Sequence, residues 1–270
     1  MAIFALWYFE SRIFLALPSF AIGHLFGKAP KHALYQSEND KINTTPVNMP
    51  IVDGRGGKYN TPFVSCEEYF KESEILEDNW QCIREELDAL LSNMNVIPQF
   101  DEIDPLEKRL VASDGGIPWR MYGLKIYGKY MKKAMNECPK TIALLKQVEH
   151  KISHAFFSIL EPGKDIPPHF GPFRSVYRYH LGLKIPKSGG AAITVDDKKY
   201  VWREGEGVLF DDTFLHSAKN DTKEIRVVLF IDVYRNDLPK RVSLLHKWVE
   251  KFIRSSPSYK RSLRKVNQGL

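Results

Sequence analysis

Three residues far apart in the sequence have side chains suited to binding a metal ion and an anion. His169 lies in the rigid segment PPHFGP (167–172), and His216 closes the segment FDDTFLH (210–216). Neutral imidazoles at the ends of neighbouring strands suit a first-row metal such as iron, which proteins often hold with two histidines and one carboxylate. That carboxylate normally stands two residues after the first histidine, where this sequence has Gly171. Spacing alone therefore supports a metal site no better than it supports two structural histidines.

Arg226 shifts the balance toward a metal site. It lies ten residues after His216, at the start of the apolar run VVLFI (227–231). An arginine directed into a β-barrel needs a partner, because an unpaired buried guanidinium costs several kcal/mol. A dicarboxylate ligand is one such partner, since an arginine fork holds a carboxylate through two hydrogen bonds. The alternative is an arginine that faces solvent on an edge strand.

Three further polar residues lie in strand-like segments. Arg178 and His180 are two residues apart, so in a strand they project from the same face and both can donate to one anion. The tyrosines that precede each of them suit ordinary packing on the other face. Ser158 is a small hydroxyl residue in the apolar segment FFSIL (156–160). It either contacts a ligand or bonds to the backbone, and the sequence leaves both interpretations open.

The segments that carry these residues are typical of short β-strands. Aromatic and β-branched residues, separated by Gly, Pro and Asp, predict strands over 154–160, 178–185, 191–195, 199–202, 207–211 and 225–234. Asp196 and Asp197 lie between two of these segments and predict a hairpin. Closely spaced strands without helices between them favour an antiparallel barrel or jelly roll.

Helices are expected before and after the strand region along the chain. Asn79 can cap a helix with one apolar face. That face would hold Trp80, Ile83, Leu87, Leu90, Leu91 and Met94. Pro139 is a good first-turn residue for a shorter helix through Leu144 and Leu145, and a basic helix is expected from Pro239 to about 253. The fold class predicted is mainly β with flanking helices (α+β).

Composition bounds the remaining possibilities. With 270 residues, 43% of them hydrophobic, the chain can bury a large core, which excludes a wholly disordered or fibrous protein. The three cysteines, Cys66, Cys82 and Cys138, contain no CxxC pair. A disulfide framework and a cysteine-rich zinc site are therefore not expected. The cysteine content instead predicts an intracellular, reducing compartment.

Positive charge is concentrated at the C-terminus. Residues 235–270 contain ten Lys or Arg and two Asp or Glu, although the whole chain carries a net charge of only +6. The rest of the chain is therefore slightly acidic, and no nucleic-acid partner is expected. The tail is either a solvated helix face or a contact for an anionic membrane surface. Its basic residues include Lys240, Arg241, Lys247, Lys251, Arg254, Lys260, Arg261, Arg264 and Lys265.

The N-terminal 64 residues differ from the rest. Residues 1–27 are apolar and aromatic, but Glu10 and Arg12 interrupt them. The uninterrupted part, 13–26, still contains Pro18 and amounts to about half of a membrane-spanning helix, which needs roughly 20 apolar residues. They either associate with a membrane or dock as a buried helix, and they lack a secretory signal pattern. Residues 28–64 are expected to form an irregular connector. The expected organisation is 1–64 as the N-terminal segment and connector, 65–238 as the main domain, and 239–270 as the tail.

Taken together and in this order, the residues resemble the aspartyl/asparaginyl β-hydroxylase family of Fe(II)/2-oxoglutarate dioxygenases. The resemblance covers about 76–238 and is densest in HFGPFRSVYRYHLGLKIP (169–186), WREGEGVLFDDTFLH (202–216) and RVVLFIDVYR (226–235). The upstream segments NWQCIREEL (79–87), PWRMYGLKIYG (118–128) and CPKTIALLK (138–146) are similar to the lipid A hydroxylases of the same family.

The resemblance implies a double-stranded β-helix and a set of ligands. His169 and His216 would bind Fe(II). Ser158 and Arg226 would hold the distal carboxylate of 2-oxoglutarate, and Arg178 and His180 would contact the carboxylate nearer the metal, with O₂ as the second co-substrate.

The resemblance also bears on the substrate. Gly171 resembles the branch that hydroxylates the β-carbon of Asp or Asn in polypeptides, where iron has only two protein ligands. The upstream similarity, the apolar N-terminus and the cationic tail resemble the branch that hydroxylates acyl chains of membrane lipids. A jelly-roll binding module that has lost its iron is the third alternative.

Overall fold

The computed structural model describes residues 61–94, 97–103, 114–171 and 175–237, with residues 244, 247, 248, 251 and 255 near the C-terminus. The expected apolar segment (1–27), all but the end of the connector (28–64) and nearly all of the basic tail (239–270), with its helix, lie outside these residues. Within them, no helix has the length and apolar character needed to cross a membrane.

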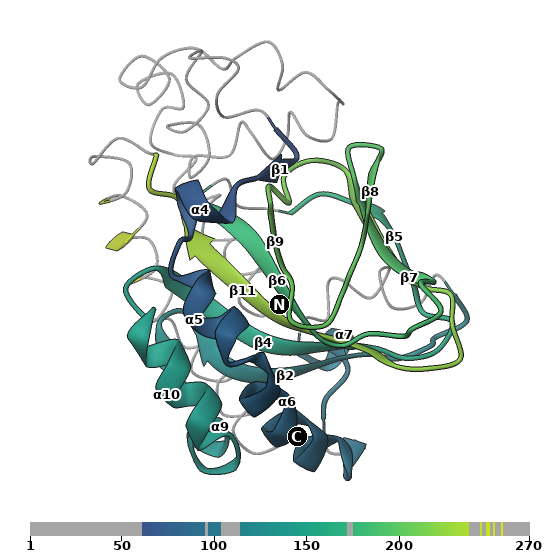
Figure 1. Cartoon of the computed structure of the whole chain (residues 1–270), viewed down its shortest axis with the longest axis horizontal. Helices are drawn as coiled ribbons and strands as arrows, with labels where there is room; N and C mark the ends of the chain where they lie inside the picture. The colour runs from purple at the N-terminus through teal and green to yellow at the C-terminus, as the bar shows by residue number, and fades with distance from the viewer. Residues whose placement is uncertain are drawn as a thin grey trace.

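Two antiparallel sheets face each other in the described part of the chain (Figure 1). The larger sheet has the strand order β1-β9-β6-β11-β4-β2-β3 and the smaller has the order β5-β10-β7-β8. The strands of the larger sheet are β1 (Phe63–Val64), β2 (Trp119–Ile126), β3 (Lys129–Tyr130), β4 (Ile152–Leu160), β6 (Val176–Lys184), β9 (Gly207–Phe210) and β11 (Arg226–Tyr234). Those of the smaller sheet are β5 (Asp165–His169), β7 (Ala191–Val195), β8 (Lys198–Val201) and β10 (His216–Asn220). This arrangement is a jelly roll, the double-stranded β-helix that the sequence predicts.

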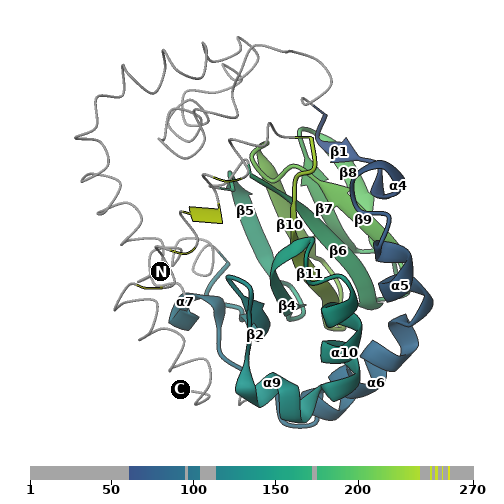
Figure 2. The same cartoon turned by 90° about the vertical axis from the view of Figure 1, so that its left-hand side faces the viewer.

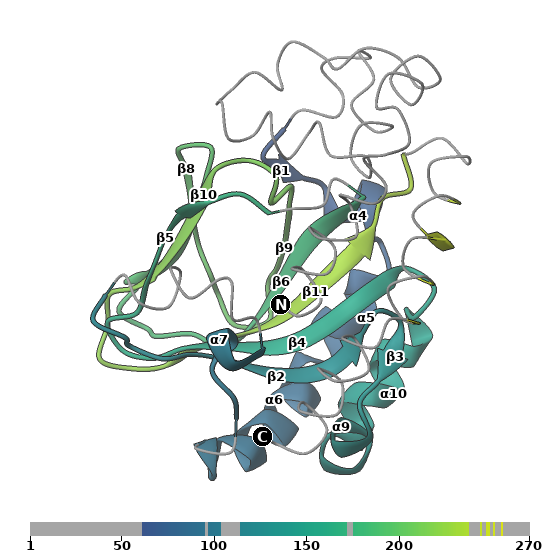
Figure 3. The same ribbon diagram turned by 180° about the vertical axis from the view of Figure 1, so that it is seen from behind.

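In the described part of the chain, most helices cover the outer face of the larger sheet (Figures 2 and 3). They are α4 (Cys66–Tyr69), α5 (Ser73–Asp78), α6 (Trp80–Leu91), α9 (Lys132–Glu137) and α10 (Pro139–Gln147), and α7 (Phe100–Ile103) contacts β2. Ile83 and Leu87 of α6 are completely buried in the core between helices and sheet. The inner face of the sheet thus stays turned toward the smaller sheet.

Strand β11 shows how the alternation of a strand separates two cores. Val227, Leu229 and Ile231 pack with the helices, whereas Val228 and Phe230 belong to the core between the two sheets. Successive side chains of a strand point to opposite faces, so Arg226 shares the inner face with Val228 and Phe230. Both faces are covered, which explains the continuous apolar run in this strand.

All six predicted strands are present, with ends that differ by up to two residues. The predicted hairpin joins β7 to β8, and Asp196 and Asp197 both have positive φ angles, 49° and 61°, which suit a two-residue hairpin turn. Strands β1, β2, β3, β5 and β10 were not predicted. The sequence DIPPH of β5 contains two prolines, and a strand can accept them because β5 lies at the edge of its sheet.

The two predicted helices of the main domain are confirmed, but one detail was wrong. Pro139 is the first residue of α10, as expected. Asn79 precedes α6, yet its side chain accepts no hydrogen bond from that helix. Instead, its amide nitrogen donates to the carbonyl of Ile75, 2.9 Å away, because α5 ends directly before α6. The last two residues of the expected irregular connector also differ from the prediction, since they form β1.

Candidate functional site

His169 and His216 lie side by side although they are far apart in the sequence. His169 is the last residue of β5, His216 is the first of β10, and the two are paired across these strands. Their ring centroids are 4.1 Å apart and their planes are inclined at 50°. The sequence-based prediction of two imidazoles on adjacent strand ends is therefore confirmed.

Backbone carbonyls fix the protonation of both rings. Nδ1 of His169 lies 2.8 Å from the carbonyl oxygen of Pro167, and Nδ1 of His216 lies 2.9 Å from that of Phe214. A carbonyl only accepts, so each Nδ1 carries a proton, and in the neutral form of each ring Nε2 keeps its lone pair. Burial, followed by the nearby His169, lowers the pKa of His216 well below its usual range. The ring of His216 is therefore neutral, and both imidazoles have the orientation in which the Nε2 of a neutral ring can bind a metal.

Gly171 stands where a third ligand would be expected, and no side chain fits there. A Cβ atom on Gly171 would lie 1.9 Å from Oδ2 of Asp212, whose carboxylate fills that space. The two segments are also joined by a hydrogen bond of 2.7 Å from the Gly171 N–H to the Asp212 carbonyl. In the described ranges, no group of three or more His, Cys, Asp or Glu residues could hold a metal ion.

Arg178 links two buried carboxylates beside the histidine pair. Its Nη2 lies 2.8 Å from Oδ2 of Asp212 and its Nε lies 2.8 Å from Oδ1 of Asp232. Nδ1 of His154 lies 3.1 Å from the other oxygen of Asp232. Burial raises the pKa of Asp212 to about 7, although Arg178 acts in the opposite direction. The charge of Arg178 is therefore already matched by carboxylates of the protein itself.

Arg226 has no such carboxylate partner among the described residues. It is 2% exposed, and in the described part of the chain its Nη1 donates to the Ser158 carbonyl over 3.1 Å while its Nε has no acceptor. Burial lowers the pKa of this guanidinium to about 9. Ser158 lies on the neighbouring strand β4, where its hydroxyl accepts from Nε1 of Trp119 over 3.1 Å and keeps its own hydrogen for another acceptor. The solvent-facing alternative for Arg226 is therefore excluded.

His180 completes a cluster of buried polar side chains, three of which have at least one nitrogen without a hydrogen-bond partner among the described residues. Among the described residues, neither of its ring nitrogens has a hydrogen-bond partner, and Nε1 of Trp202 has none either. Burial, followed by Arg226, lowers the pKa of His180 well below its usual range, so the ring is neutral. Phe210 lies against both His180 and His216, with ring centroids 5.1 Å and 6.1 Å away. This cluster, which we call the anion pocket (Ser158, His180, Trp202, Arg226), thus shares a wall with the histidine pair.

The chemistry of the anion pocket fits a small dicarboxylate. Buried polar groups in proteins are nearly always hydrogen-bonded, and those left without partners destabilise the fold. A molecule with carboxylate oxygens would satisfy the guanidinium, the imidazole and the hydroxyl together. A second oxygen-bearing group on the same molecule could reach a metal at the adjacent histidines.

Sequence reasoning found six of the residues assembled here but missed others. Trp202 and Asp212 were treated as parts of a strand and a turn, and Asp232 as part of an apolar strand. A signal was present in two of these cases, since Asp212 lies within the segment that ends at His216 and Asp232 is the one charged residue inside VVLFIDVY (227–234).

A family model described as aspartyl/asparaginyl beta-hydroxylase matches residues 77–236. The chain is 34% identical over 176 residues to the ornithine lipid ester-linked acyl 2-hydroxylase of Rhizobium tropici, covering 65% of this chain and 61% of that protein. It is 30% identical over 167 residues to the human aspartyl/asparaginyl beta-hydroxylase, covering 60% of this chain and 21% of that protein. In both cases the match spans less than two thirds of the relative.

Among solved structures, a predicted oxalate decarboxylase from Thermotoga maritima aligns with 33% of this chain and 73% of its own, at 16% identity and a TM-score of 0.27. A cupin domain from Schizosaccharomyces pombe aligns with 33% of this chain and 61% of its own, at 16% identity and a TM-score of 0.28. The fold assignment rests on the strand pairing described above.

Proposed function

Because the chain belongs to the aspartyl/asparaginyl β-hydroxylase family, we propose that it is an Fe(II)- and 2-oxoglutarate-dependent dioxygenase that hydroxylates an unactivated carbon. The observation that carries this proposal is Arg226, a buried guanidinium without a carboxylate partner among the described residues, in a pocket beside two paired imidazoles. A structural arginine at this depth would have an acidic partner.

Each residue of the site has a role in this proposal. His169 and His216 would bind Fe(II) through their Nε2 atoms. Arg226 and Ser158 would hold the distal carboxylate of 2-oxoglutarate, and His180 and Arg178 would hold the carboxylate nearer the metal. When bound, Fe(II) and 2-oxoglutarate supply the oxidation of the carbon by O₂, with succinate and CO₂ as the products of the co-substrate.

The protein's own contribution is orientation and the exclusion of water. The carbonyls of Pro167 and Phe214 keep both metal-binding imidazoles in one tautomer and one orientation. Phe210 and Trp202, each 1% exposed, keep water out of the anion pocket. Arg178 fixes the carboxylate of Asp212 against Gly171, next to the histidines.

Two substrates are supported, each by one observation. A polypeptide Asp or Asn residue is favoured by Gly171, because the two-histidine set resembles the peptide-hydroxylating branch. An acyl chain is favoured by the aromatic wall (Phe156 and Phe230), whose rings lie 5.9 Å apart on the inner face next to Arg178.

Succinate release tests the activity. Wild-type protein should form succinate from 2-oxoglutarate in the presence of Fe(II), and His169→Ala and His216→Ala should abolish it. Mass spectrometry then identifies the substrate as a product heavier by one oxygen atom, on Asp- or Asn-containing peptides or in a lipid extract. No succinate from the wild-type protein with either substrate mixture would refute the proposal and leave the binding-module alternative.

A further inference from the structure

Trp202 is a buried residue of the anion pocket whose polar atom has no role in the family resemblance. Its side chain is 1% exposed, and within the part of the chain that the structure describes its Nε1 has no acceptor. The guanidinium carbon of Arg226 lies 4.4 Å from the centre of the indole ring, and the ring of His180 lies 5.9 Å away. Trp202, His180 and Arg226 therefore lie together in the interior, and each has at least one nitrogen without a hydrogen-bond partner among the described residues.

Simple packing does not account for this residue. A buried tryptophan usually finds an acceptor for its N–H, because an unsatisfied donor destabilises the fold. A phenylalanine would fill most of the same space, stack on Arg226 and leave no donor without a partner. The indole N–H is therefore better explained by an acceptor that arrives with a ligand.

The backbone around Trp202 is fixed by a close approach to β6. Trp202 follows β8 and precedes the loop 203–206, and a Cβ atom on Gly182 would lie 2.0 Å from the carbonyl oxygen of Arg203. Gly182 also exchanges hydrogen bonds with this loop, donating to Glu206 over 3.1 Å and accepting from Gly205 over 2.9 Å. Only glycine at position 182 permits this contact.

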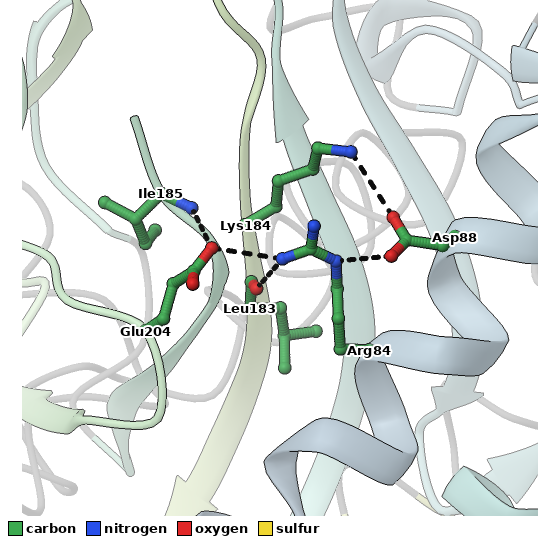
Figure 4. A network of polar contacts seen from close by, with 6 residues as sticks. All are labelled: Arg84, Asp88, Leu183, Lys184, Ile185 and Glu204. Carbon is green, nitrogen blue, oxygen red and sulfur yellow. Dashed lines mark hydrogen bonds and ion pairs between the residues drawn. The ribbon is translucent and has the colours of Figure 1, made fainter. Parts of the chain in front are cut away.

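A polar clasp holds the same loop from the side of α6 (Figure 4). Oε1 of Glu204 accepts from Nη1 of Arg84 over 3.1 Å and from the Ile185 N–H over 3.2 Å. Arg84 also donates to the Leu183 carbonyl and lies 2.7 Å from Asp88. Helix α6, the end of β6 and the loop after Trp202 are thereby joined, which fixes the position of the indole.

We propose that Trp202 is a third donor to the carboxylate that Arg226 binds, and that its ring holds the guanidinium in place before the co-substrate arrives. The proposal rests on the proposed function, because it needs 2-oxoglutarate in the anion pocket. The face of the indole stabilises the cation in the empty pocket. When the co-substrate binds, Nε1–H donates to the distal carboxylate together with Arg226 and Ser158, so the pocket selects a 2-oxo acid with a second carboxylate.

Calorimetric titration of the full chain with 2-oxoglutarate, with Zn(II) in place of iron, tests the proposal. Trp202→Phe keeps a ring against Arg226 but lacks the donor, so the dissociation constant should rise by about tenfold or more. Affinity for 2-oxobutanoate, which lacks the distal carboxylate, should change by less than about twofold. Trp248→Phe, the same substitution at a residue 52% exposed, is the matched control and should change neither affinity.

The outcomes are distinguishable. If wild-type protein does not bind 2-oxoglutarate with the metal, the proposed function fails and this proposal fails with it. If wild-type protein binds and Trp202→Phe binds equally well, or if both acids weaken to the same extent, only the role of Trp202 is overturned.

A measurement on the wild-type chain covers the case in which Trp202→Phe does not fold. The chain has five tryptophans, and their indole N–H resonances can be followed by NMR during the titration. The resonance of Trp202 should move downfield as 2-oxoglutarate binds, as expected for a new hydrogen bond to a carboxylate. An unchanged Trp202 resonance in a protein saturated with 2-oxoglutarate would overturn the proposal.

Discussion

Replacing Arg226 with methionine should make the empty protein more stable and the co-substrate site much weaker. Burial lowers the pKa of this guanidinium to about 9, and at 1.36 kcal/mol per pKa unit the fall from its ordinary value corresponds to roughly 5 kcal/mol for keeping the charge inside the protein. The ring of Trp202 and the carbonyl of Ser158 offset part of this cost. Since buried charges can often be replaced by apolar side chains with a gain, the free energy of unfolding should rise by about 1–4 kcal/mol.

Urea unfolding of the metal-free protein, without 2-oxoglutarate, measures this gain. The matched control is Arg120→Met, because Arg120 is paired with Glu161 at 2.7 Å and its loss should destabilise the chain. In the same preparations, Arg226→Met should weaken 2-oxoglutarate binding by at least about a hundredfold, since it removes charge-assisted hydrogen bonds. Arg120→Met should leave that affinity unchanged.

Two results would refute this reasoning. A lower stability of Arg226→Met than of wild type, without ligand, would make Arg226 a structural residue. An unchanged 2-oxoglutarate affinity would place the carboxylate elsewhere.

Three further predictions follow from the geometry. Gly171→Asp should lower the free energy of unfolding by about 1–3 kcal/mol, because its Cβ meets the carboxylate of Asp212. In thermal melts, the double variant with Asp212→Gly should recover most of the lost stability. A single variant as stable as wild type would contradict this prediction. The pKa of His180 is far below 6.5 in the native state, so the unfolded chain takes up a proton that the native state does not. As the pH falls below about 6.5, the free energy of unfolding should therefore decrease by up to about 1.4 kcal/mol per pH unit, and it should decrease less in His180→Phe. If urea unfolding at pH 5 and pH 7 shows the same decrease in wild type and in His180→Phe, a buried neutral ring is excluded. Glu204→Ala opens the clasp to Arg84, so 2-oxoglutarate should bind up to about fivefold more weakly while Zn(II) affinity stays constant; a loss of Zn(II) affinity instead would show general damage.

The sequence predicted those parts of the fold and site that depend on residue type and local alternation. A β-rich segment with apolar residues on both faces identifies β11, and an arginine at its start identifies the position that needs an anion. The two histidines stood out because imidazoles flanked by proline, glycine or a turn suit metal ligation.

Features that depend on contacts between distant segments could not be predicted. The carboxylate of Asp212 occupies the place of a side chain at Gly171 only because β5 and β10 are paired. Strand β10 has the polar sequence HSAKN, and its alternation is visible only once the neighbouring strands are known. Trp202 was predicted as the last residue of a strand, since nothing in its neighbours along the chain shows that its N–H is buried and has no acceptor among the described residues.

The most direct test of the account is a crystal structure of the protein with Mn(II) and 2-oxoglutarate, prepared without oxygen. We predict the metal between Nε2 of His169 and Nε2 of His216, with one end of 2-oxoglutarate on the metal and the other carboxylate on Arg226. A metal bound away from these histidines, or an anion pocket that stays without a carboxylate at saturating 2-oxoglutarate, would contradict the assignment.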